Sequence, residues 1–304
     1  MGTSELAYRL HKIEQVFNTE RLLSLDITRS YIQRYWKINQ RAYDILHTRS
    51  GKIYIGISRD GVYKDDDLLE AARFVEKYIR ELNATRVLEL ATGRGATSLY
   101  LAEKFPQVEF EGIDFSPGQL EYAYKRAAKI KNYHPAPGDY HDLDRFANDS
   151  FDVALVNEAL CYSMRKEVVL SETCRVLRRG GVFVVLDVYG KQPVEQLSRD
   201  ELLAKQLTER GMALENFENY KEFLGKARQV GFRIIHDEDV SAFTLPALSK
   251  WEKLAKKYFY VPALARAFNR FFPPEFLYNT ISGWLLPLLL RSGVLSYNIT
   301  VLQK

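Results

Sequence analysis

The chain has 304 residues, of which 46% are hydrophobic and 27% are charged, a balance that is typical of a globular protein and excludes a disordered chain. Its two cysteines are too few for a disulfide framework, its five histidines show no metal-ligand spacing, and no apolar run reaches the ~18–20 residues of a transmembrane helix. The net charge of +4 is unevenly spread, because residues 246–304 hold eight Lys and Arg against two acids. We therefore expect a cytoplasmic protein without a metal site, and an anionic surface or substrate near the C-terminal end.

The N-terminal region, residues 1–64, is predicted to be a helical cover followed by a loop. Apolar side chains recur at helical spacing over residues 4–47, beginning with Leu6, Leu10, Ile13 and Phe17. Residues 49–64 are punctuated by glycine and predict a loop. Acids occur early and no apolar core segment is present, so we expect no signal peptide.

From residue 65 onward the chain alternates between helix and strand. A helix is predicted from the acids at Asp65, which suit the positive end of a helix dipole, to about Leu82. Apolar runs then predict strands over 86–90, 108–113, 151–156, 182–188, 232–236 and 295–303. Further helices are predicted over 95–104, from Pro117, over 165–177 ending at Gly180-Gly181, and over 218–230, with a polar loop over 132–150. Strands that alternate with helices predict a parallel sheet covered on both faces.

An insert over residues 243–293 interrupts this alternation before the final strand. It is predicted to be helical, and it is both basic and aromatic. Its most apolar run is Trp284-Leu285-Leu286-Pro287-Leu288-Leu289-Leu290. Four roles remain open for the insert: core packing, a wall for a lipophilic substrate, a peripheral membrane contact, or a homodimer surface.

A glycine turn and three acids mark a ligand site. Glu89 precedes a small-residue turn that contains Gly93 and Gly95, Asp114 ends the second strand, and Asp139 lies where a third strand should end. Ligands of open α/β sheets bind at the carboxyl ends of strands, where these residues would meet. A carboxylate beside the turn would repel a pyrophosphate and attract a cationic ligand, which favours a cationic nucleoside over a dinucleotide.

In these residues the chain resembles the class I S-adenosylmethionine-dependent methyltransferases over about residues 85–190. The resemblance implies a Rossmann-like α/β three-layer sandwich with a mostly parallel seven-stranded sheet and an antiparallel last strand. It implies a cofactor-binding core over 65–242, a substrate-covering insert over 243–294 and a final core strand over 295–304. It also implies S-adenosylmethionine as cofactor, held by Glu89, Ala91, Gly93, Gly95, Asp114, Phe115, Asp139, Tyr140 and Asn157. Within that set, Asp114 would bind the ribose, Phe115 and Tyr140 would flank the adenine, and Asp139 would accept from its amino group.

The segment from Asn157 to Tyr162 is similar to that of the subgroup that methylates sterols, isoprenoids and tocopherol-like lipids. This resemblance implies a lipophilic small-molecule substrate and a catalytic role for Glu158 and Tyr162. Glu158 could stabilise a carbocation or take a proton from an amine or phenol. Base-modifying members of the family often carry an Asn/Asp-Pro-Pro-aromatic motif here, so we expect no nucleic-acid substrate. The alternatives are a nicotinamide-dependent oxidoreductase, from the glycine and Asp114 spacing, or a non-catalytic membrane- or partner-binding module with a vestigial pocket.

Overall fold

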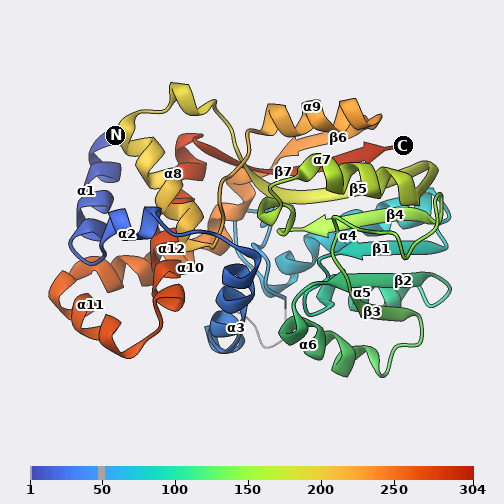
Figure 1. The fold of residues 1–304 in the computed structure, drawn as a ribbon, viewed down its shortest axis with the longest axis horizontal. Coiled ribbons are helices and arrows are strands. Elements are labelled where there is room, and N and C mark those ends of the chain that lie inside the picture. The colour runs from blue at the N-terminus through green and yellow to red at the C-terminus, as the bar shows by residue number, and fades with distance from the viewer. Residues whose placement is uncertain (1, 47–51) are drawn as a thin grey trace.

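The structure is a computed structural model that describes residues 2–46 and 52–304. His47 and the first residues of the loop predicted over 49–64 therefore lie outside the described residues. The described part forms an elongated molecule, with a sheet at one end and a helical lobe at the other (Figure 1).

One seven-stranded sheet forms the core, in the order β3-β2-β1-β4-β5-β7-β6. Its strands are β1 (Arg86–Leu90), β2 (Glu109–Asp114), β3 (Tyr133–Pro137), β4 (Phe151–Asn157), β5 (Leu177–Gly190), β6 (Arg233–Asp239) and β7 (Leu295–Gln303). β7 runs antiparallel to both of its neighbours, and the other pairs are parallel. The predicted Rossmann-like sheet with an antiparallel last strand is confirmed.

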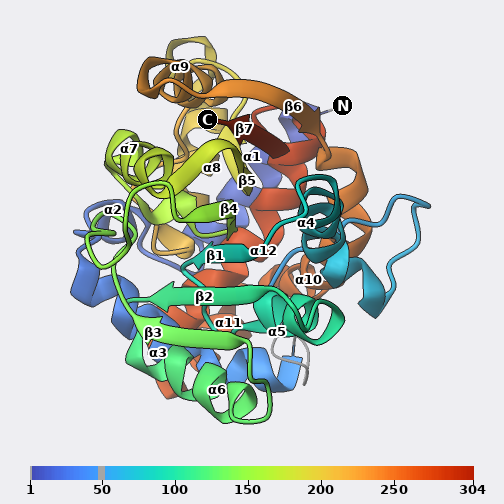
Figure 2. The same ribbon diagram turned by 90° about the vertical axis from the view of Figure 1, so that its right-hand side faces the viewer.

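Helices cover both faces of the sheet, as Figure 2 shows in an end-on view. On one face lie α4 (Glu70–Glu81), α5 (Ala96–Lys104) and, beside β3, α6 (Pro117–Ala127); on the other lie α7 (Lys166–Val176) and α9 (Tyr220–Val230). The central strands β4 and β5 are buried almost throughout, whereas the edge strand β6 alternates between exposed and half-buried residues. This burial explains why the central strands are continuous apolar runs in the sequence.

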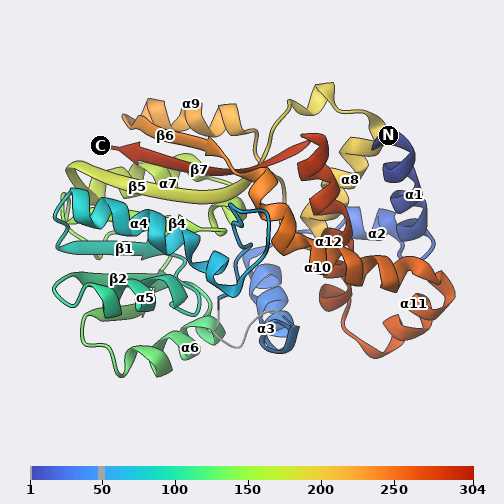
Figure 3. The ribbon, with the colours of Figure 1, turned by 180° about the vertical axis from the view of Figure 1, so that it is seen from behind.

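A helical lobe stands beyond the carboxyl ends of the parallel strands (Figure 3). It combines α1 (Gly2–Glu14), α2 (Thr19–Leu23), α8 (Arg199–Gly211), α10 (Ser241–Tyr260), α11 (Pro262–Phe268) and α12 (Pro274–Ser292). α12 packs against α8, α10, α1, β7 and α3 (Arg29–Leu46), so the N-terminal and C-terminal helices build one body. The helical nature of both regions is confirmed. Among the described residues, no helix combines the length and the apolarity needed to cross a bilayer.

Two local predictions were wrong, and one helix was missed. Tyr133–Pro137 is strand β3 rather than part of a loop; its two prolines are tolerated because it lies at the edge of the sheet. The helix before β5 ends at Val176, and Gly180 lies inside the strand with a φ of 78°. Helix α8, capped by Ser198 and Glu201, was not predicted at all.

The apolar run of α12 is core. The side chains from Trp284 to Leu290 are all buried, and Phe259 stacks on Trp284 with ring centroids 4.7 Å apart. This run therefore offers no surface to a membrane or to a second subunit.

Candidate active site

The glycine turn lies between β1 and α5, at the point where the order of the sheet reverses between β1 and β4. Ala91, Gly93 and Gly95 have φ values of 51°, 56° and 74°. A Cβ at Gly95 would lie 2.6 Å from the hydroxyl oxygen of Tyr133, so glycine is required there by space as well as by conformation. Ala91 adopts the left-handed conformation without being glycine, and such strain is typical of ligand sites.

Glu89 lies beneath this turn. It is 2% exposed, and its Oε2 accepts hydrogen bonds from the hydroxyls of Thr92 at 2.6 Å and Ser98 at 2.5 Å. Burial raises the pKa of Glu89, against the effect of these donors. Neither Glu89 nor Gly95 lines the neighbouring cleft, so a direct ligand contact of Glu89 stays a prediction, and its observed contacts fix the shape of the turn.

Asp114 faces the cleft from the end of β2. Its carboxylate accepts backbone N–H hydrogen bonds from Gly93 at 2.8 Å and Ser116 at 2.7 Å. Burial raises the pKa of Asp114 to about 6, although both hydrogen bonds oppose the shift. Each carboxylate oxygen has a second lone pair, so Asp114 can still accept from a hydroxyl of a ligand.

The cleft beside Asp114 consists of two adjoining hollows of about 210 and 80 Å³. Ala91, Asp114, Phe115, Tyr140 and Tyr162 line both of them. Most of the residues predicted to bind the cofactor are thus brought together from the ends of β1, β2, β3 and β4.

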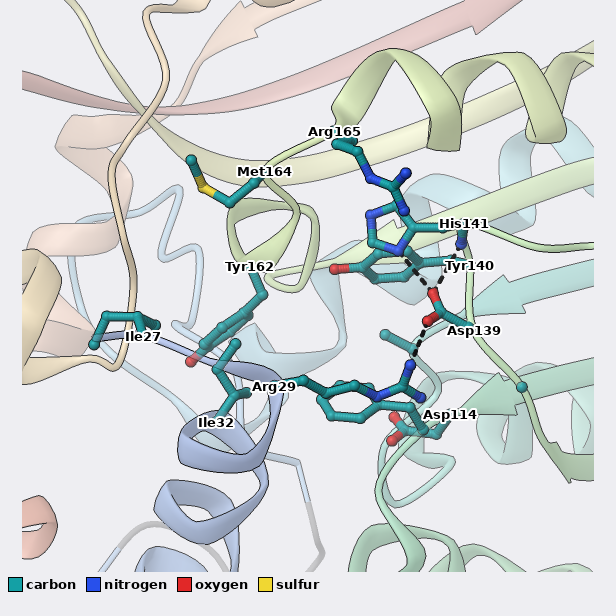
Figure 4. A pocket seen from close by; sticks show the side chains of 13 residues that line it. Ile27, Arg29, Ile32, Asp114, Asp139, Tyr140, His141, Tyr162, Met164 and Arg165 are labelled. Atoms are coloured by element: carbon teal, nitrogen blue, oxygen red, sulfur yellow. Dashed lines mark hydrogen bonds and ion pairs between the residues drawn. The ribbon is translucent and has the colours of Figure 1, made fainter. Parts of the chain in front are cut away.

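Arg29, at the start of α3, closes one side of this cleft (Figure 4). Its guanidinium lies 5.0 Å from the ring centroid of Phe115 and 2.8 Å from Oδ2 of Asp139. Oδ1 of Asp139 is 2.7 Å from Nδ1 of His141. Partial burial opposes ionisation of Asp139, but the hydrogen bonds from His141 and the charge of Arg29 lower its pKa. The contact of Asp139 with an adenine amino group stays a prediction.

The side-chain amide of Asn157 indicates whether the cleft suits a polar ligand. It ends β4 and lines the smaller hollow, and both polar atoms of its side-chain amide are buried without a hydrogen-bond partner among the described residues. Buried amides are nearly always hydrogen-bonded, so this side chain is suited to a ligand that both donates and accepts. The donors, acceptors and aromatic rings of the cleft therefore fit a nucleoside such as S-adenosylmethionine.

Glu158 stands where the cleft meets a second cavity. Its Oε1 accepts from the Tyr297 hydroxyl and from the Ile55 backbone N–H, both at 2.7 Å. Its φ of 52° is a left-handed conformation that residues other than glycine rarely adopt, and such strain is typical of ligand sites. Burial raises the pKa of Glu158 to about 7, against the two hydrogen bonds. Both charge states of this carboxyl are therefore accessible near neutral pH.

The second cavity has a volume of about 240 Å³ and a mainly apolar lining. It shares Trp36, Ile53, Tyr54, Glu158 and Tyr162 with the cleft. Its far wall is built by α10 and α12, including Leu248, Trp251, Ala255, Gly283 and Leu286. Tyr162 lies at the junction, with its ring centroid 6.0 Å from that of Trp36.

Several residues of the site were not predicted. Tyr54 lines both spaces and lies 3.0 Å from the Thr97 hydroxyl, Tyr297 anchors Glu158, and Arg29 and His141 hold Asp139. The apolar alternation around Tyr54 was the one available signal, but its glycine neighbour favoured a loop. Within the described residues, no group of three or more His, Cys, Asp or Glu could hold a metal ion.

Comparison with known proteins gives a family match over most of the core and the start of the insert. Residues 81–257 match the family model described as a methyltransferase domain. The chain is 38% identical over 114 residues to demethylmenaquinone methyltransferase of Thermotoga maritima, covering 38% of this chain and 48% of that protein. It is 25% identical over 171 residues to sterol methyltransferase-like 1 of Botryococcus braunii, covering 55% and 43%. The chain thus spans less than half the length of these relatives.

Among solved structures, the fold is similar to geranyl diphosphate C-methyltransferase from Streptomyces coelicolor A3(2). That structure contains Mg²⁺, geranyl diphosphate and S-adenosyl-L-homocysteine. The TM-score is 0.62 with 16% identity, over 92% of this chain and 98% of the other. This likeness extends the match in fold through both helical regions.

Proposed function

The chain belongs to the methyltransferase domain family, and on that premise we propose that it transfers a methyl group from S-adenosylmethionine to a lipophilic small molecule. The acceptor would be an isoprenoid, a sterol or a related lipid, methylated at carbon or at a heteroatom. One observation carries this proposal: a polar nucleoside-type cleft and an apolar cavity meet at Glu158 and Tyr162. Demethylmenaquinone and sterols are named for the relatives, which supports the same class of substrate.

The cofactor would lie in the cleft. Asp114 would accept from the ribose, Asn157 would pair with polar groups of the ligand, and the backbone of Gly93 would allow close approach. Phe115 and Tyr140 would flank the base, with Asp139 and Arg29 at its rim. When bound, S-adenosylmethionine supplies an electrophilic methyl group.

The acceptor would lie in the apolar cavity. Its walls come from α3, the segment around Tyr54, and the insert helices α10 and α12, so the insert would act as a substrate cover. A mainly apolar wall would keep water away from the acceptor and orient it, and both effects favour transfer to a single atom. Tyr162 would form the boundary between acceptor and cofactor.

Glu158 would be the catalytic carboxylate. Oε1 is held by Tyr297 and Ile55, while no hydrogen-bond partner occupies Oε2 among the described residues. For a carbon nucleophile, the ionised group would stabilise positive charge that develops on the acceptor. For a phenol or an amine, it would take the proton, and a pKa of about 7 suits a general base at neutral pH.

Two measurements test the proposal. Isothermal titration should show binding of S-adenosylmethionine and of its demethylated product, and methyl transfer should be detectable with demethylmenaquinone, sterol or isoprenoid acceptors. Absence of both binding reactions would contradict the proposal.

A variant tests the role of Glu158. Glu158→Gln should lower kcat by about 10²- to 10⁴-fold while binding of the demethylated product is kept. Equal loss of binding would make Glu158 a structural residue instead.

The remaining proposals concern partners and location. We propose no nucleic-acid substrate, in keeping with Asn157-Glu158-Ala159-Leu160 after β4. A peripheral membrane contact through residues 243–293 is favoured over a homodimer by the charge of that region.

The free thiols of Cys161 and Cys174 are in keeping with a reducing, cytoplasmic location, which cell fractionation would test. The comparisons lend no support to a nicotinamide-dependent oxidoreductase or a non-catalytic module.

A further inference from the structure

A tip at the end of the helical lobe exposes apolar side chains. We define the tip as residues 253–274, from the second half of α10 through α11 to the start of α12; in Figure 1 it lies at the end of the molecule remote from the sheet. Half of the large hydrophobic side chains that are exposed among the described residues lie in these 22 positions. They include Phe271 at 80% exposed, Tyr260 at 73% and Leu264 at 69%. Such clustering marks an interaction surface.

The tip is also purely cationic. It contains no acid and five exposed basic side chains: Lys253, Lys256, Lys257, Arg266 and Arg270. None of the five forms an ion pair with another residue in the described part of the chain. Apolar side chains surrounded by unneutralised cations complement an anionic lipid surface, since rings enter the interface while lysine and arginine bind headgroups.

This surface differs from the one that the sequence suggested. The most apolar run of the insert, Trp284 to Leu290, is buried in the lobe. The exposed apolar residues of the tip fall into short groups separated by Lys256-Lys257, Arg266 and Arg270, so they do not form a long apolar run. Only the fold brings Tyr260, Leu264 and Phe271 onto one end of the lobe.

An aromatic series connects the tip with the apolar cavity. The rings of Phe268 and Phe272 stack with centroids 4.3 Å apart, and Phe272 lies 5.5 Å from Phe276. Phe276 lines the cavity, as does Leu254, which is itself 47% exposed on the tip. The cavity wall is thus continuous with the exposed apolar surface.

We propose that the tip docks on the surface of an anionic lipid bilayer, with Leu264 and Phe271 entering the headgroup region. The acceptor then passes from the bilayer along Phe268, Phe272 and Phe276 into the cavity. Docking stands independently of methyl transfer; the passage of the acceptor rests on the proposed function.

Vesicle flotation of the full chain tests docking. The protein should float with vesicles of phosphatidylcholine mixed with phosphatidylglycerol, and much less with phosphatidylcholine alone. Binding should weaken with salt, because the Debye length shortens. The pair Lys256→Gln with Lys257→Gln should reduce partitioning by about fivefold for each charge removed. The pair Leu264→Ser with Phe271→Ser should reduce it by at least about tenfold.

Matched controls keep the test specific. Val62→Ser removes a side chain that is 62% exposed elsewhere, and Lys129→Gln removes an exposed cation on the loop after α6; both should float like the unchanged chain. No flotation, equal flotation with both vesicle types, or flotation unaffected by the tip variants would overturn the proposal. Sedimentation showing a dimer that the tip variants convert to monomer, without vesicle binding, would assign the tip to a second copy and overturn it as well.

A turnover assay separates docking from acceptor passage. With demethylmenaquinone embedded in anionic vesicles, the Leu264→Ser and Phe271→Ser pair should lose most of its turnover, whereas detergent-dispersed acceptor should be methylated at the unchanged rate. Equal loss in both forms would overturn the passage. Vesicle binding without turnover of any acceptor would count against the proposed function and leave docking supported.

Discussion

The hydroxyl of Tyr297 donates a 2.7 Å hydrogen bond to Oε1 of Glu158, across 139 positions of sequence. Tyr297 lies on β7, the antiparallel strand that returns from the insert, and Glu158 follows β4. The strand that closes the sheet thereby also positions the carboxylate at the junction of the two cavities. The length of the insert between β6 and β7 does not disturb this contact, because β7 is registered against β5 over nine residue pairs.

This hydrogen bond lowers the pKa of Glu158, against burial, which raises it to about 7. We predict that Tyr297→Phe raises the pKa further, by about one unit, because a hydrogen bond to a charged group contributes about 1.5–3 kcal/mol. The limb of the pH–rate profile that reports Glu158 should move to higher pH. Tyr8→Phe, at an exposed tyrosine of α1, is the control and should leave the profile in place. If this limb of the pH–rate profile is unchanged in Tyr297→Phe, the ionisation that controls the rate is not that of Glu158.

The same carboxyl should make stability depend on pH. Its pKa is raised on folding, from 4.5 to about 7, so the native state binds more protons than the unfolded state between these values. The free energy of unfolding should therefore be highest below about pH 4.5, as far as Glu158 contributes, and should fall as the pH rises through 7. Glu158→Gln should abolish this fall. Relative to the unchanged chain, the variant should therefore be more stable at pH 8 than at pH 4.5, by a difference of the order of 2–3 kcal/mol. Denaturant unfolding at the two pH values measures it, and a gain that is equal at both would contradict the assignment.

The raised pKa of Asp114 predicts that cofactor binding depends on pH. Burial raises its pKa to about 6 in the free protein, and protonation would turn one carboxylate oxygen into a hydrogen-bond donor and weaken the group as an acceptor. The Kd of the demethylated cofactor should rise as the pH falls below 6, approaching about tenfold per pH unit. Asp114→Asn should weaken binding at pH 8 and flatten this dependence, whereas Glu121→Gln on the exposed face of α6 should change neither. Titration calorimetry would refute the role of Asp114 if the variant kept the full dependence.

Most of the fold could be predicted from the sequence, because local pattern and burial agree in the central strands. β1 and β4 are apolar runs, a glycine turn joins β1 to α5, and Asp114 was located correctly at the end of β2. β3 was not predicted, because an edge strand needs little apolar character. Its sequence, Tyr133-His134-Pro135-Ala136-Pro137, also contains two prolines, which rarely occur in strands.

The site was predictable only where its residues follow strands. Asp114, Asn157 and Glu158 could be placed at one edge because parallel strands end together. The partners Arg29, Tyr54 and Tyr297 come from the N-terminal cover and the last strand, and their approach depends on how the helical lobe packs against the sheet. The burial of Trp284 could not be predicted from the sequence for the same reason, because an apolar run in a helix can face a core or form an interaction surface.

The glycine turn should tolerate no side chain at Gly95. A Cβ there would lie 2.6 Å from the Tyr133 hydroxyl, at a φ of 74°. Gly95→Ala should lower the free energy of unfolding by about 2–3 kcal/mol, since strained φ and overpacking each contribute about 1–3 kcal/mol. Gly225→Ala, inside α9 with nothing near its Cβ, should instead stabilise by about 0.5–1 kcal/mol. Thermal unfolding of both variants checks the prediction, and equal stability of Gly95→Ala and the unchanged chain would contradict the geometry of the turn.

Gly283 offers a way to fill the apolar cavity without touching the cleft. It lies inside α12 and lines the cavity, and a Cβ would meet Trp251 at an ordinary 3.7 Å, so a larger side chain can extend into the open space. Leucine is also a better helix former than glycine, which favours folding of the variant. Gly283→Leu should therefore lower kcat/KM for a long lipophilic acceptor by at least about tenfold, the effect of roughly 1.4 kcal/mol, with the Kd of the demethylated cofactor unchanged. Gly225→Leu on α9 provides the control for a glycine-to-leucine change away from the cavity. Unchanged kcat/KM in Gly283→Leu would place the acceptor outside this cavity, whereas a loss that grows with acceptor length would locate the far end of the lipid against α12.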